Sequence, residues 1–174
     1  VGGTTFYGSG RPVKVCMHVR GTARTDERVM REAAALQHAN FAVTILDIEE
    51  DLSCPAEEEI RGIHVKHILK PGWLKPVAFR PLRLLLSVQK VVYTTVKLIQ
   101  TPTDVYHAHD DNALAACYIA ALWHRTPLIL DAHEFPLNNI IHRRWLNMLV
   151  TGLFGLMVRR CAEIITVSPS IAQE

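Results

Sequence analysis

The chain has 174 residues, of which 49% are hydrophobic and 21% are charged, and its formal net charge is +2. This length suits one domain with a sizeable core, and the composition is that of a globular protein rather than a disordered one. So small a charge gives no support for a nucleic-acid-binding protein.

The first residues predict a flexible tail over 1–11, followed by one domain over 12–174. The opening VGGTTFYGSG is rich in Gly, Ser and Thr and lacks the basic and apolar regions of a signal peptide. No run reaches the roughly 18–20 uncharged apolar residues that cross a bilayer. The cysteines form no CxxC pair, so we expect free thiols and a reducing cytoplasm; they are Cys16, Cys54, Cys117 and Cys161.

Strand-like and helix-like runs alternate along the rest of the chain. Apolar, β-branched or alternating patterns predict strands at 13–19, 41–47, 63–69, 104–109, 127–133 and 163–167. Helical periodicity predicts helices at 28–38, 82–100, 112–125 and 139–161, with an acidic loop at 49–59 and a proline-rich loop at 71–81. This order predicts an α/β fold, a Rossmann-like doubly wound parallel sheet with helices on both faces.

Ligands of such sheets bind beyond the carboxyl ends of the strands, so the residues that follow each strand matter most. The first strand is followed by Gly21 and Thr22, and then by a helix that Asp26 is expected to cap. A glycine before a helix N-terminus can bind a phosphate through backbone N–H groups. A plain exposed loop explains this segment equally well.

The fourth and fifth predicted strands carry histidines and carboxylates at their ends. Strand alternation puts His107 and His109 on one face, with Asp110 at the strand tip. The next strand ends in Asp131, Ala132, His133 and Glu134. Two such groups at the ends of neighbouring strands predict a site, although a histidine in a strand is often a hydrogen-bonded core residue.

Taken in order, these segments resemble the N-terminal domain of GT-B-fold glycosyltransferases, especially the retaining family four. The resemblance covers roughly residues 12–174. The pieces that carry it are Asp26-Glu-Arg28-Val29, Arg31-Glu32-Ala33 with Leu36, Val43-Thr-Ile-Leu46, Asp104-Val-Tyr-His107-Ala-His109-Asp110, Asp131-Ala-His133-Glu134 and Ala162-Glu163-Ile-Ile-Thr166-Val167-Ser168.

The resemblance implies two Rossmann-like domains that face a cleft, with the nucleotide-sugar donor held mostly by a C-terminal domain that these residues do not include. We therefore expect the chain alone to bind no cofactor and to transfer no sugar, and the full-length protein to transfer a glycosyl group with retention. The implied site has no metal ligand. On the donor side the implied residues are Gly21, Thr22 and Arg28. On the acceptor side they are His109, Asp110, Glu134 and Ser168. His133 is implied as the catalytic contact near the reacting carbon. A glycine pair is usual in the first loop of this family, whereas this chain has only Gly21 there.

Two of the predicted helices are unusually apolar. In residues 82–101 the polar side chains form one narrow stripe, and residues 145–158 are apolar between flanking arginines. Packing inside the domain explains this pattern. A basic-edged surface that rests on the inner face of an anionic membrane, next to a sugar or lipid-linked acceptor, explains it as well, and so does contact with a partner subunit.

Two other functions remain open from the sequence. A metal-dependent hydrolase could use the ligand set His107, His109, Asp110, Asp131 and His133, because His-x-His on one strand is reasonable ligand geometry. A non-catalytic flavodoxin-like binding module would have the same fold. In that module the acidic pocket should follow the first strand, where Arg20 and Gly21 stand.

Overall fold

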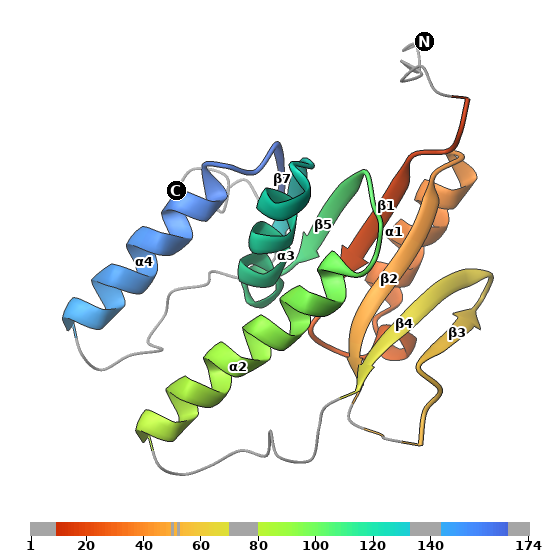
Figure 1. The fold of residues 1–174 in the computed structure, drawn as a ribbon. Coiled ribbons are helices and arrows are strands. Elements are labelled where there is room, and N and C mark those ends of the chain that lie inside the picture. The colour runs from red at the N-terminus through yellow and green to blue at the C-terminus, as the bar shows by residue number, and fades with distance from the viewer. Residues whose placement is uncertain (1–9, 50, 52, 70–79, 133–143, 167–174) are drawn as a thin grey trace.

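A seven-stranded sheet forms the centre of the protein in the computed structural model, which describes residues 10–49, 51, 53–69, 80–132 and 144–166 (Figure 1). The strand order is β3-β4-β2-β1-β5-β6-β7, parallel throughout except for β3. The strands are β1 Lys14–His18, β2 Ala42–Glu49, β3 Glu57–Ile60, β4 Ile63–Leu69, β5 Val105–His109, β6 Leu128–Ala132 and β7 Glu163–Thr166. The predicted Rossmann-like α/β class is confirmed.

Helices cover both faces of this sheet, as expected. The α-helices among the described residues are α1 Glu27–His38, α2 Arg80–Ile99, α3 Asp111–His124 and α4 Arg144–Val158, and a short 3-10 helix, η1, spans Ala23–Thr25. Helix α1 packs on one face with one group of buried side chains, whereas α2, α3 and α4 pack on the other (Figure 1).

Strand alternation divides the buried side chains between these two layers. In β1, Val15 and Met17 face α1, while Cys16 faces the opposite layer. In that layer Tyr106 is fully buried, and its hydroxyl donates a hydrogen bond to the carbonyl of Leu98 at 3.0 Å. The α1 layer is therefore the one on which the odd-numbered residues of β5 stand, His107 and His109 included.

The acidic segment 49–59 is not wholly a loop, because β3 lies within it. Residues 57–60 pair antiparallel with β4, and Ile60 lies opposite Ile63. The two-residue turn between them, Arg61 and Gly62, has φ angles of 52° and 80°, as a type I′ hairpin requires. Glutamates suit this position, since charged side chains protect an edge strand from pairing with other chains.

Candidate functional site

The carboxyl ends of β1, β5 and β6 lie side by side at the centre of the sheet. His18 is in register with Ala108, and His109 with Asp131, so the three strand tips are level. The ring of His18 is buried, and its Nδ1 lies 2.8 Å from the carbonyl of Leu46. Burial lowers the pKa of His18 to about 4, so this imidazole is neutral at physiological pH.

The loop between β1 and α1 carries the residues expected to face the donor. Gly21 is exposed, and a β-carbon there would meet no atom within 4 Å, so the space beside this backbone is open. Asp26 caps α1 as predicted, because its Oδ1 accepts hydrogen bonds from the N–H groups of Arg28 and Val29 at 3.2 and 3.1 Å. Those N–H groups are already occupied. A diphosphate at this loop would therefore depend on the backbone around Gly21 and Thr22.

A buried ionic network holds this loop in place. The Ala23 N–H donates to Asp47 Oδ2 at 2.8 Å, and Asp47 Oδ1 lies 2.6 Å from Nδ1 of His67 on β4. The other ring nitrogen of His67 lies 2.9 Å from Glu58, whose carboxylate also binds Arg24 of the loop at 2.6 Å. Four elements, β2, β3, β4 and η1, are joined through one imidazole.

The charge state of His67 follows from its two carboxylate neighbours. Its side chain has no exposed area, and burial alone would lower its pKa. Hydrogen bonds with Asp47 and Glu58, and the charges of these two groups, outweigh burial and raise the pKa of His67. With an acceptor at each nitrogen, the ring can donate to both carboxylates only in its protonated form.

The sequence analysis did not identify this network. The available signal was the alternation Ile63, Val65, His67, which places a histidine on the apolar face of β4. A polar side chain there has to find partners inside the protein. Those partners, Asp47 and Glu58, are distant in sequence, so the pattern alone could not name them.

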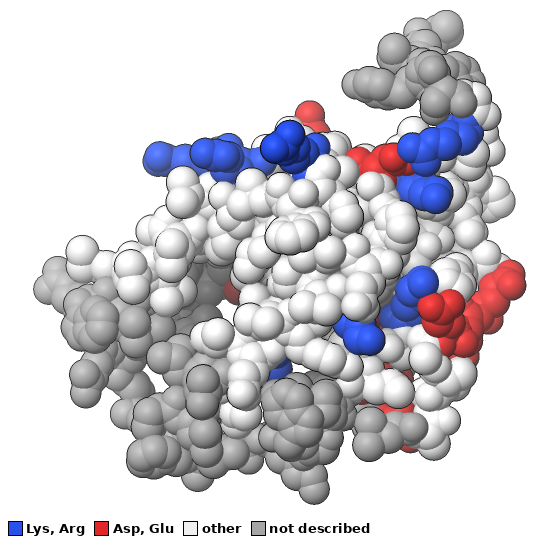
Figure 2. Space-filling model, in the orientation of Figure 1, with Lys and Arg blue, Asp and Glu red and all other residues white. Residues whose placement is uncertain are grey.

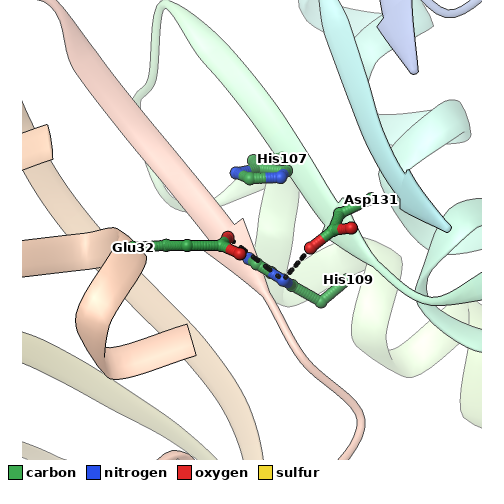
Figure 3. A group of neighbouring side chains, drawn as sticks. All are labelled: Glu32, His107, His109 and Asp131. Carbon is green, nitrogen blue, oxygen red and sulfur yellow. Dashed lines mark ion pairs between the residues drawn. The ribbon is translucent and has the colours of Figure 1, made fainter. Parts of the chain in front are cut away.

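A second group, the β5–β6 cluster, consists of Glu32, His107, His109 and Asp131 (Figure 3). The rings of His107 and His109 lie side by side, tilted by 34° with centroids 4.3 Å apart, which confirms that they share a face. Nδ1 of His109 lies 3.5 Å from Asp131 Oδ2 and 3.8 Å from Oε2 of Glu32, which reaches over from α1 (Figure 3). Histidines and carboxylate thus come together at neighbouring strand ends, with Glu32 as a member that the sequence analysis did not name.

Asp110, directly after β5, has a strained backbone. Its φ and ψ angles are 71° and 163°, a combination that is essentially restricted to glycine and costs about 1–3 kcal/mol. Its N–H donates to the carbonyl of Asp131 at 3.0 Å. Beside it, Arg20 donates a hydrogen bond to the side chain of Asn112, which links the loop after β1 to the first turn of α3. Such outliers concentrate at functional sites.

Not every predicted site residue can be placed. His133, Glu134 and Ser168 lie outside the described residues, and the roles of Gly21, Thr22, Arg28, His109 and Asp110 toward ligands stay predictions. The hydrolase ligand set comes together only in part. His107, His109 and Asp131 converge, but Glu32 rather than Asp110 completes the group.

Comparisons with known proteins agree with this architecture. The sequence model of Glycosyltransferase Family 4 matches residues 27–174. A segment of sucrose-phosphate synthase from Thermosynechococcus elongatus superposes with a TM-score of 0.60 at 13% identity, over 91% of this chain and 78% of that one. MurG from Acinetobacter baumannii superposes with a TM-score of 0.53 at 13% identity, over 91% of this chain and 42% of that one. No curated protein sequence matches significantly.

The fold and the strand-end site define a Rossmann-like α/β domain, and this fold is shared with the structures above. The chain belongs to Glycosyltransferase Family 4, since the family model covers most of its length. It spans 44% of the longer sucrose-phosphate synthase structure, which superposes with a TM-score of 0.60 at 11% identity over 92% of this chain.

Proposed function

We propose that this chain is the N-terminal, acceptor-side domain of an enzyme that transfers a sugar from a nucleotide-sugar donor to an acceptor. The family match over residues 27–174 carries this proposal. The level tips of β1, β5 and β6 supply the matching physical feature, because ligands of doubly wound sheets bind at this edge. Metal-dependent hydrolysis and a non-catalytic module have no comparable support.

The proposed enzyme needs a second domain for its donor. This chain spans less than half of the MurG structure that it resembles, which supports a longer parent protein. Gly21, Thr22 and Arg28 would approach the donor diphosphate, and His133 the transferred sugar. The chemical requirements are an oriented acceptor hydroxyl and stabilisation of the charge that develops on the leaving diphosphate.

The acceptor side is assigned to the tip of β5 and the segments that follow β6 and β7. The His109 ring has no exposed area, so we propose that it acts on the acceptor by fixing the adjacent Asp110. Asp110, Glu134 and Ser168 would then make the direct contacts. Retention of the anomeric configuration is part of the proposal and rests on the family resemblance.

The test uses the full-length parent protein and follows nucleotide release from a panel of nucleotide sugars, with the product anomer assigned by NMR. Gly21→Val places a side chain in the open space beside the loop, and we expect kcat/KM to fall at least about tenfold, or about 1.4 kcal/mol. Gly152→Ala on α4, where the added carbon also meets nothing within 4 Å, is the matched control. Wild-type kcat/KM in Gly21→Val, or robust transfer by the 174-residue chain alone, would contradict these assignments.

The layer formed by α2, α3 and α4 supports a lipid-linked acceptor. Large apolar side chains are exposed on all three helices, among them Val92 at 55%, Trp123 at 71% and Met148 at 68%. Figure 2 shows this side as a broad uncharged surface with Lys and Arg at its margins, where Asp and Glu also lie. Among the described residues, no helix is both long enough and apolar enough to cross a membrane.

We propose peripheral contact between this layer and an anionic membrane, because exposed apolar side chains beside basic ones favour that interface. Co-sedimentation with phosphatidylglycerol vesicles at low salt, compared with neutral vesicles, tests it. Binding that falls on Trp123→Ser supports the contact, whereas no binding to anionic vesicles removes it.

A further inference from the structure

The β5–β6 cluster has the composition and spacing of a metal site. We propose that Glu32, His107, His109 and Asp131 bind one Zn²⁺ ion, a role that the transferase function does not require. The sequence analysis considered His107, His109 and Asp131 only as ligands of a hydrolytic metal, and it did not name Glu32. Their ligand atoms all lie within 4.8 Å of one another and come from α1, β5 and β6 (Figure 3).

The distances fit a bridging ion better than direct hydrogen bonds. Zinc bonds to nitrogen and carboxylate oxygen are about 2.0–2.2 Å long, which places tetrahedral ligand atoms roughly 3.3–3.6 Å apart. His109 Nδ1 is 3.5 Å from Asp131 Oδ2 and 3.8 Å from Glu32 Oε2. A direct N–H···O hydrogen bond would bring these atoms to about 2.7–3.2 Å.

The buried ring of His109 also calls for a partner. The His109 side chain has no exposed area, and neither of its ring nitrogens makes a hydrogen bond within the described part of the chain. Each such atom costs about 1–3 kcal/mol, and coordination would use the lone pair of the ring nitrogen that carries no proton.

Electrostatics favour a cation at the same point. Carboxylate oxygens of Glu32 and Asp131 lie 3.8 and 3.5 Å from the same imidazole nitrogen, His109 Nδ1. Two negative charges held this close together repel one another. A divalent ion between them would remove that conflict.

The donor set identifies the metal and the kind of site. Two imidazole nitrogens with two carboxylate oxygens suit Zn²⁺, whereas Mg²⁺ and Ca²⁺ prefer oxygen ligands alone. Four protein ligands fill a tetrahedral shell, which is typical of structural rather than hydrolytic zinc. Glu32 is 34% exposed and gives the ion a route from solvent. The bound ion would tie α1 to the tip of β5, directly before the strained Asp110.

The experiment uses tag-free protein that has been freed of metal with a chelator. We expect it to bind one equivalent of Zn²⁺ in competition with a chromophoric chelator at pH 7.5. Glu32→Gln should lower the affinity for Zn²⁺ by about 100-fold or more, since the loss of even a residue that only supports a ligand lowers metal affinity by about 10–100-fold. Glu27→Gln is the matched control, because Glu27 lies on the same helix outside the cluster and pairs with Arg61 at the surface.

Co²⁺ substitution provides a readout that needs no variant. Tetrahedral coordination by two nitrogens and two oxygens should give intense visible d–d bands in the wild type, and Zn²⁺ should abolish them. The proposal is overturned if the wild type binds Zn²⁺ no better than Glu32→Gln, or if bound Co²⁺ gives only the weak spectrum of an octahedral ion. A doubly protonated His109 in histidine NMR, unchanged by added Zn²⁺, would also overturn it and identify an imidazolium between the two carboxylates.

Discussion

Replacing His67 by alanine tests the network that supports the loop after β1. The change removes a ring whose two nitrogens bridge Asp47 and Glu58 at 2.6 and 2.9 Å. Asp47 has no exposed area and would keep only the N–H of Ala23 as a described hydrogen-bond partner. A buried carboxylate would therefore lose its counter-charge.

The expected loss of stability in His67→Ala is large. Removing one partner of a buried ion pair destabilises a protein by about 3–5 kcal/mol, because the remaining charge stays desolvated. For a chain of this size 1 kcal/mol corresponds to about 2–4 °C, so Tm should fall by roughly 6–20 °C. Loss of the Asp47–His67 bond should also release Ala23, and with it the Gly21 loop.

Urea unfolding at pH 6, followed by far-UV circular dichroism, measures the free energy of unfolding. The matched control is His64→Ala on the same strand, because His64 is 45% exposed and lies 3.5 Å from Glu57 at the surface. Exposed pairs contribute about 0–1 kcal/mol. If both variants lose the same stability, the buried network does not contribute as described.

The protonation of His67 gives the free energy of unfolding a pH dependence of definite sign. Since the pKa of His67 is raised, the folded protein binds this proton more tightly than the unfolded chain does. Its stabilisation is complete below the ordinary value of about 6.5 and is lost as pH rises through the raised folded-state pKa. The wild type should therefore lose stability on the alkaline side of about pH 6.5, and His67→Ala should lack this decline.

Three further predictions concern single positions. Asp110→Gly should be more stable than Asp110→Ala by about 1 kcal/mol in thermal unfolding, because only glycine relaxes at a φ of 71°; equal stability would show that the backbone is unstrained. Asp26→Ala should cost about 1 kcal/mol by loss of the cap on Arg28 and Val29, and an unchanged urea midpoint would contradict this. An alkylating reagent, with labelling followed by mass spectrometry, should modify Cys54 before the buried Cys16 and Cys117. Burial raises the pKa of Cys16 to about 12 and that of Cys117 well above its ordinary value. Early labelling of Cys16 would refute its burial.

Sequence periodicity was sufficient to predict the parallel strands of the sheet but not its acidic edge strand, β3. The predicted strand at 63–69 coincides with β4, and the predicted helix at 112–125 is α3 within one residue at each end. Residues 57–59 were assigned to a loop, because three successive glutamates give no apolar alternation. This segment becomes a strand through its pairing with β4 and the turn at Arg61 and Gly62, and such long-range pairing overrides local propensity.

The sequence predicted those site residues that lie at the ends of strands. It did not predict those that reach the site from another element, such as a helix packed on the sheet. Alternation placed His107 and His109 on one face, and parallel topology brought Asp131 beside them. Glu32 could not be assigned, because its place in the cluster depends on how α1 lies on the sheet. The position of Asp47 against His67 likewise depends on a register between β2 and β4 that one sequence does not reveal.

The hydrogen bond from Arg20 to Asn112 crosses the sheet between β1 and β5, where the strand order changes direction. An anionic ligand bound at this edge of the sheet would compete with the amide oxygen of Asn112 for the Arg20 guanidinium, because a charged acceptor binds it more strongly than a neutral one. Exchange of that single partner would uncouple the start of α3 from the loop after β1. Ligand binding at this edge would thereby be linked to the freedom of these two segments through one side chain, Arg20.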